Sequence, residues 1–86
     1  MPTRIDANSV RQRLRTLRLE RGLTQDTIAE RAEISSKHYQ DLELGRKGFN
    51  PNLETLNALA VALEVELFDL LYDRAALTAL LEHSVT

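Results

Sequence analysis

Hydrophobic residues recur every three or four positions along this chain, in runs separated by short polar stretches. That spacing places them on one face of an α-helix. A first helix is therefore expected over about 9–21, with Asn8 or Ser9 as its N-cap and Gly22 in the left-handed position after its end. The residues expected on its inward face are Val10, Leu14 and Leu17.

Two short helices joined by a three-residue turn are expected next. Thr24 is a suitable N-cap for the first of them, which extends over about 24–31. Ser35 is a suitable N-cap for the second, and Gly45 ends it. The buried positions expected in these two helices are Ile28, Ala29, Ala32, Tyr39 and Leu42.

The rest of the chain continues the helical pattern. After a loop over 45–51, Asn52 caps a fourth helix whose apolar face carries Leu56, Leu59, Ala60 and Leu63. A short fifth helix is indicated by Val65, Phe68 and Leu71, and the segment 75–83 also has helical propensity. With no strand pattern and no repeat, the expected fold class is all-α, in a single domain over residues 1–86.

Charge is distributed unevenly along the chain. The formal net charge of -2 at first argues against a nucleic-acid partner. Between Arg4 and Lys47, however, ten Lys or Arg residues stand against seven Asp or Glu, whereas from Gly48 onward Arg74 alone stands against six acids. A basic half in an acidic protein is a hint of a polyanion-binding surface.

Composition excludes several other classes of protein. Cysteine is absent, so there is no disulfide, thiolate nucleophile or cysteine-bound zinc. His38 and His83 lack companions at metal-ligand spacing, and no phosphate-loop or nucleophile motif occurs, so neither a cofactor nor an enzyme is expected. No apolar run approaches the roughly 18 residues that a membrane span needs, and the first eight residues lack a signal-peptide pattern, so a cytoplasmic protein is expected.

An ordered set of short motifs runs from Leu14 to Leu71. It comprises Leu17-Arg18, Arg21-Gly22-Leu23-Thr24-Gln25, Ile28-Ala29, Ile34-Ser35, Tyr39, Leu42-Glu43, Gly45-Arg46, Asn50-Pro51-Asn52-Leu53-Glu54-Thr55-Leu56, Leu59-Ala60 and Leu63. In these motifs the chain resembles the XRE or phage-repressor and Cro-like family of helix-turn-helix transcriptional regulators. The resemblance implies a five-helix DNA-binding domain whose helix-turn-helix motif lies at about 24–43.

The second helix of that motif is the expected base-reading element. A major groove about 12 Å wide admits one α-helix, whose first turns touch base edges. If the core takes Ile34, Tyr39 and Leu42, the residues left for DNA are Ser36, Lys37, Gln40 and Asp41. Lys37 suits a guanine edge, Gln40 an adenine edge, and Asp41 the amino group of cytosine.

A second set of residues is expected to contact phosphates. The resemblance implies that Gln25, at the start of its helix, bonds a backbone phosphate, where the helix dipole also favours an anion. The full predicted set is Thr24, Gln25, Ser35, Arg46, Lys47 and Asn52. The resemblance further implies that Arg18 and Glu43 form a structural ion pair between helices one and three.

Leucines near the C-terminus are more numerous than a five-helix core obviously needs. They are Leu67, Leu70, Leu77, Leu80 and Leu81. Segment 74–86 is expected either to fold back on its own core or, preferably, to pack against a twofold mate. Dimerisation is also expected because one helix-turn-helix unit reads too few base pairs for selectivity.

The expected function is a repressor or autoregulator that binds a palindromic operator on double-stranded DNA as a homodimer. Two alternatives use the same domain. One is an antitoxin whose C-terminal leucines cover a toxin partner, and the other is a controller protein of a restriction-modification operon.

Two glutamates depart from the family pattern. Glu33 and Glu64 stand where the family usually has glycine. A glutamate at positive φ costs on the order of 1 kcal/mol. The backbone is therefore expected either to differ locally at these positions or to absorb the strain.

Overall fold

The computed structural model describes residues 6–46, 48–72 and 81–82. Its helices are α1 (Ala7–Glu20), α2 (Gln25–Arg31), α3 (Ser36–Leu44), α4 (Leu53–Ala62) and α5 (Leu67–Leu71). Residues 81 and 82 are also helical, and they are the only described part of the helix expected over 75–83. No strand occurs within these ranges, which confirms the all-α class with five helices.

Side-chain caps define where most of these helices begin. Thr24, Ser35 and Asn52 each accept a hydrogen bond from the backbone N–H three residues later, as the sequence predicts. The prediction for α1 was wrong, because Asp6 is the cap and the helix begins before Ser9. The Asp6 carboxylate accepts from both the N–H and the hydroxyl of Ser9, and its charge suits the positive end of the helix.

Both departures from the family pattern lie in the left-handed region. Glu33 and Glu64 each have φ of 58°, so the backbone keeps the turn that glycine would favour. After each glutamate an N–H bonds back across the turn, from Ile34 to the Ala29 carbonyl and from Val65 to the Ala60 carbonyl, both at 3.0 Å. The side chains of Ile34 and Val65 pack against the core, which helps to offset strain of about 1 kcal/mol at each glutamate.

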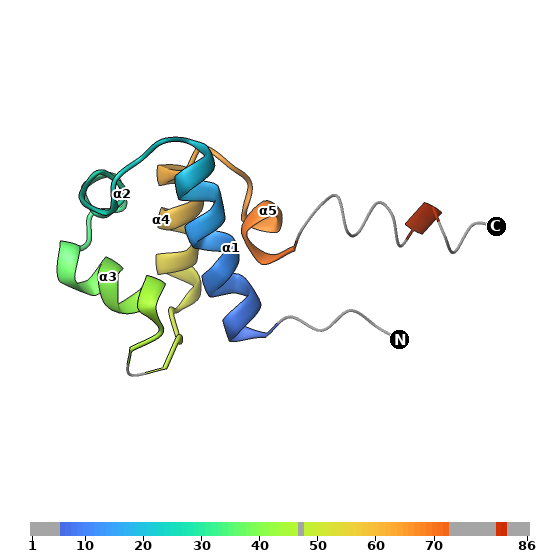
Figure 1. Cartoon of the computed structure of the whole chain (residues 1–86), viewed down its shortest axis with the longest axis horizontal. Helices are drawn as coiled ribbons and strands as arrows, with labels where there is room; N and C mark the ends of the chain where they lie inside the picture. Colours follow the sequence, from blue (N-terminus) through green and yellow to red (C-terminus); the bar gives the residue numbers. More distant parts are fainter. Residues whose placement is uncertain (1–5, 47, 73–80, 83–86) are drawn as a thin grey trace.

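The core lies where the five helices converge. Helix α1 packs against α3 and α5, α2 against α3 and α4, and α4 against α5. The largest fully buried side chains are Tyr39, Leu14, Ile28, Leu59, Leu63 and Leu70. In Figure 1, α2 and α3 lie on one side of α1 and α4, and α5 lies on the other. The outer face of α3 is therefore left uncovered by the rest of the described chain.

Helix α5 corrects one expectation about the predicted dimer interface. Leu70 is completely buried, so assigning it to a dimer interface was wrong: its side chain lies in the core of this chain. Leu67 is half-buried and also packs against that core. Phe68 is 38% exposed, and its ring lies tilted against that of Tyr72 at a centroid distance of 5.0 Å.

The remaining predicted interface leucines are placed differently. Leu81 is 57% exposed. Leu77 and Leu80 lie outside the described residues. Within the described ranges, no helix is both long and apolar enough to cross a membrane.

Candidate nucleic-acid interface

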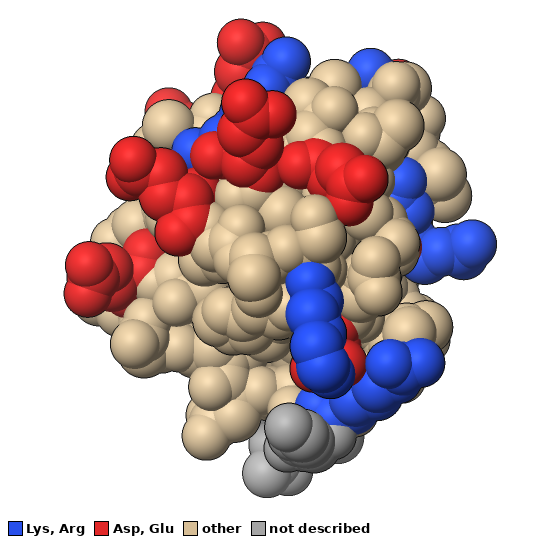
Figure 2. All heavy atoms as spheres, turned by 90° about the vertical axis from the view of Figure 1, so that its left-hand side faces the viewer, with Lys and Arg blue, Asp and Glu red and all other residues tan. Residues whose placement is uncertain are grey.

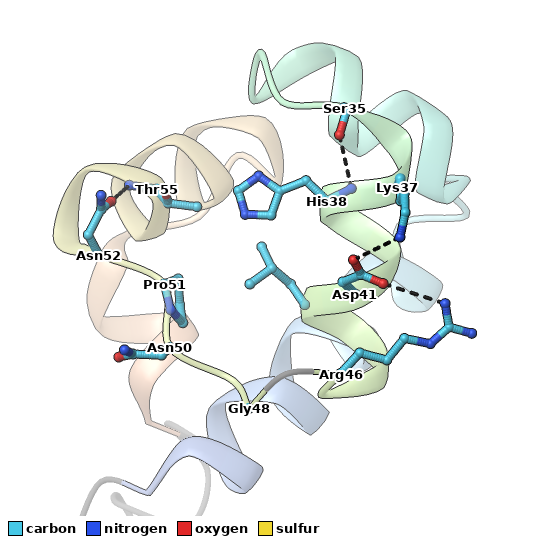
Figure 3. Close-up of a pocket in the computed structure, with 11 residues that line it drawn as sticks. Ser35, Lys37, His38, Asp41, Arg46, Gly48, Asn50, Pro51, Asn52 and Thr55 are labelled. Atoms are coloured by element: carbon cyan, nitrogen blue, oxygen red, sulfur yellow. Dashed lines mark hydrogen bonds and ion pairs between the residues drawn. The ribbon is translucent and has the colours of Figure 1, made fainter.

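An open groove of about 510 Å³ runs between α3 and the start of α4. The loop that joins the two helices forms its lower edge (Figure 3). The groove brings together five of the predicted DNA-contacting residues, which are Ser35, Lys37, Asp41, Arg46 and Asn52. Residues distant in the sequence thus form one concave surface.

The four predicted base-contacting residues divide into two pairs. Lys37 and Asp41 line the groove, and Lys37 is the most exposed of the four, with 76% of its side chain accessible. Ser36 and Gln40 are half-buried on the same helix and are not part of the groove lining. The inward face of α3 carries Tyr39, Leu42 and Glu43.

His38 lines the groove, although from the sequence alone it is considered only as a metal ligand. Its side chain is exposed and extends from α3 toward Thr55 at the start of α4 (Figure 3). The three-residue spacing between His38 and Asp41 is the sequence signal that places it on this face. A histidine here adds a hydrogen-bonding ring to the groove wall. The described residues contain no cluster of three side chains suited to holding a metal ion.

The start of α4 gives the groove an edge that favours anions. Asn52 uses its side-chain oxygen to cap the helix at 2.8 Å from the Thr55 nitrogen, so its amide NH₂ remains available as a donor. Unpaired backbone N–H groups and the positive end of the helix dipole lie at the same place. Lys47, predicted as a further phosphate contact, lies outside the described residues.

Two other predicted phosphate contacts lie on α2 and do not line the groove. Thr24 caps α2, and its hydroxyl also hydrogen-bonds the Thr27 hydroxyl at 2.9 Å. Gln25 is half-buried at the start of α2.

A buried ion pair fixes α3 against α1. Arg18 donates to both carboxylate oxygens of Glu43, at 2.9 and 2.7 Å, and to the Leu23 carbonyl at 2.9 Å. Burial opposes ionisation of Glu43, but the two hydrogen bonds from Arg18 and the positive charge of Arg18 hold the pKa of this carboxyl below its ordinary value. The hydrogen bond with Glu43 likewise raises the pKa of Arg18, and burial raises the pKa of the Tyr39 phenol. All three groups therefore keep their usual charge states at neutral pH.

Arginines of α1 also contact the C-terminal end of α3. Arg11 donates to the Glu43 carbonyl at 3.0 Å, and the exposed Arg15 lies 3.6 Å from the Glu43 carboxylate. Positive charge at this end suits the negative pole of the helix. Gly45, with φ of 72°, ends α3 so close to Arg11 that an added Cβ would lie 3.0 Å from the arginine Cδ.

Charge is unevenly distributed on the face that carries α2 and α3. In Figure 2, acidic side chains gather over the upper part of this face with some basic ones among them, and basic side chains lie over its lower and right-hand parts. The groove cations Lys37 and Arg46 are both exposed. The overall negative charge of the chain therefore does not describe the surface around the groove.

Comparison with known proteins found both similar sequences and similar structures. A family model described as a helix-turn-helix domain matches residues 10–70. The chain is 50% identical over 60 residues to the HTH-type transcriptional regulator DdrOP3 of Deinococcus deserti, covering 70% of this chain and 45% of that protein. It is 43% identical over 58 residues to the immunity repressor protein of Bacillus phage phi105, covering 67% and 39%. The chain thus spans less than half the length of either relative.

Two crystal structures are similar as well. The restriction-modification controller protein C.AhdI from Aeromonas hydrophila has a TM-score of 0.64 and 34% identity, covering 71% of this chain and 89% of that one. The hypothetical transcription factor NHTF from Neisseria has a TM-score of 0.65, with coverage of 93% and 94%. At 24% identity, the second likeness concerns the fold alone.

Proposed function

Because this chain belongs to the helix-turn-helix family of DNA-binding transcriptional regulators, we propose that it recognises a palindromic operator as a homodimer and represses transcription there. Helix α3 enters the major groove, and the start of α4 and the loop before it follow the phosphate backbone. The main observation in support of this proposal is the groove, which is lined by residues of α3, by Arg46 and by the α4 cap Asn52.

The proposed contacts divide into base reading and phosphate binding. Lys37, with its exposed ammonium on the first turn of α3, reads a guanine edge, and Gln40 and Ser36 extend the reading face along the helix. Arg46 and Asn52 bind phosphates beside the groove, with Thr24, Gln25, Ser35 and Lys47 as the further predicted phosphate contacts.

A homodimer is proposed because one recognition helix reads too few base pairs for a selective operator. A twofold dimer places two α3 helices in half-sites about 34 Å apart. The exposed Leu81 belongs to the proposed interface, together with Leu77 and Leu80 at helical spacing in the sequence. The name of the phage immunity repressor supports the repressor role.

Selection of bound duplexes from a randomised pool tests the proposal. The purified protein is expected to enrich an inverted repeat that binds two chains. The logarithm of its binding constant should fall with the logarithm of salt concentration by about 0.9 for each phosphate neutralised. Failure to enrich any sequence at low salt would contradict the proposal.

Substitutions of Lys37 and Arg46 should separate base reading from phosphate binding. Lys37→Ala is expected to remove about 1–3 kcal/mol of discrimination at one base pair of each half-site. Arg46→Ala should weaken binding to the operator without changing the preferred base at any position, and should reduce the salt slope. Titrations of operator and random duplexes at several salt concentrations measure these effects. Equal losses on the two duplexes for Lys37→Ala would show that Lys37 reads no base.

A second function is favoured by one structural relative. The 34% identity to the controller protein C.AhdI supports control of a restriction-modification operon by the same domain. Under this function, methyltransferase and endonuclease genes adjoin the gene for this chain, and the selected operator occurs upstream of them. An operator elsewhere, without such neighbours, favours an independent repressor.

A further inference from the structure

Asp41 is the one carboxylate that lines the groove, among the described residues. It lies between two cations: its Oδ2 is 3.4 Å from Lys37 Nζ, and its Oδ1 is 3.5 Å from Arg46 Nη1 (Figure 3). The side chain of Asp41 is only 16% exposed, whereas those of Lys37 and Arg46 are 76% and 60% exposed. The acid thus sits beneath the two basic groups that reach out toward solvent.

This arrangement sets the charge that the groove presents to DNA. In the free protein each carboxylate oxygen faces one cation, so much of the attraction that Lys37 and Arg46 offer to phosphate is cancelled locally. Either cation must leave Asp41 to pair fully with a phosphate. When both cations leave, Asp41 remains as an unpaired negative charge in a groove filled by a polyanion, which is unfavourable.

A suitable base removes that penalty. The carboxylate of Asp41 accepts hydrogen bonds only, and the exocyclic amino group of cytosine is a donor in the major groove. A duplex that places this donor against Asp41 replaces the lost ion pairs and frees Lys37 and Arg46 for their own contacts. A duplex without it leaves the carboxylate unsatisfied.

We propose that Asp41 is a specificity-determining residue that holds Lys37 and Arg46 back from the phosphates of non-cognate DNA. The inference rests on the proposed DNA-binding function and deepens it, because it assigns to an acid the suppression of unspecific binding. Selectivity then arises as much from weakened binding to wrong sequences as from contacts with the right one.

The test compares Asp41→Asn with a charge-matched control, Glu30→Gln. Both changes remove one negative charge and keep the shape of the side chain, and Glu30 is an exposed residue of α2 outside the groove lining. Affinity is measured for the selected operator and for a random duplex across a range of salt concentrations, after circular dichroism has verified that each variant is folded.

Asp41→Asn is expected to bind the random duplex about tenfold more tightly than the wild type, and the ratio of operator to random affinity should fall by a similar factor. The salt slope on random DNA should steepen by about 0.9 for each released cation. Glu30→Gln should change both affinities by less than about threefold, as expected for a rim charge.

Two results would overturn the inference. One is an unchanged affinity of Asp41→Asn for the random duplex, and the other is an increase no larger than that of Glu30→Gln. Neither measurement requires an operator, so the inference is tested even if selection yields no sequence, an outcome that would count against the proposed function itself.

Discussion

Replacing Arg18 with leucine is expected to lower the free energy of unfolding by about 3–5 kcal/mol, the usual effect of removing one partner of a buried ion pair. Small domains have a total stability of about 5–15 kcal/mol, so the loss is a large fraction of the whole. The Glu43 carboxylate, with 3% of its side chain exposed, would be left buried without its main partner, and the Leu23 carbonyl would lose a donor. Urea titration followed by circular dichroism measures the change.

Arg15→Leu is the matched control, because Arg15 approaches the same carboxylate but is 63% exposed. An exposed pair is worth about 0–1 kcal/mol, so this variant should stay close to the wild type. The double variant Arg18→Leu with Glu43→Leu should recover most of the loss, since it leaves no unpaired charge. If the two arginine variants were equally destabilised, the contribution of each arginine to stability would not depend on its burial.

Acid should narrow the difference between wild type and Arg18→Leu. The ion pair holds the pKa of Glu43 in the folded protein below its ordinary value. The stability it contributes is therefore present above the unfolded pKa and is lost as the pH falls through the folded pKa. The two proteins should accordingly differ most near neutral pH.

Replacing Leu70 with alanine is expected to destabilise the domain by about 2–5 kcal/mol, because it opens a cavity in a completely buried site. Leu70 belongs to the core of one chain, so the loss should not depend on protein concentration. Thermal unfolding at several concentrations, followed by circular dichroism, separates this effect from one on assembly.

Leu81→Ala provides the contrast, since Leu81 is 57% exposed. It should leave the unfolding of the single chain nearly unchanged and weaken self-association, measured by light scattering or sedimentation. If Leu70→Ala lowered only self-association and left the chain as stable as before, the assignment of Leu70 to the core would be wrong.

Local features of the fold were predictable because they depend on near neighbours in the sequence. The caps Thr24, Ser35 and Asn52 satisfy N–H groups three residues away, so a short pattern is sufficient to find them. The predicted N-cap of α1 was wrong because Asp6, Asn8 and Ser9 are all residue types that favour the N-cap position. Local preference alone does not decide between them.

Helix α5 shows what the pattern could not decide. Its five residues include three leucines and a phenylalanine, so several faces appear equally apolar. Packing against α1 and α4 selects Leu70 for the core, and Arg13 of α1 also donates to the Asp69 carbonyl at 3.2 Å. Tertiary contacts decide which residue of α5 is buried, and these contacts cannot be read from the sequence of such a short helix.

The candidate site was predictable to the level of the helix face but not of individual pairings. Helical spacing placed Lys37 and Asp41 on the outer face of α3, where the structure has them. The position of Asp41 between Lys37 and Arg46 depends on how the chain turns after the end of α3. His38 was missed because its residue type directed attention to metals.

The attachment of α3 at both ends bears on how quickly the protein would find DNA. Ser35 caps its first turn, Arg11 bonds the Glu43 carbonyl in its last turn, and Arg18 holds the Glu43 side chain. The helix is therefore complete before any duplex arrives, and only the ends of long side chains such as Lys37 become ordered on contact, at about 0.5–1.5 kcal/mol each. The association rate should then be limited by diffusion, orientation and electrostatic steering, with no folding step in the encounter.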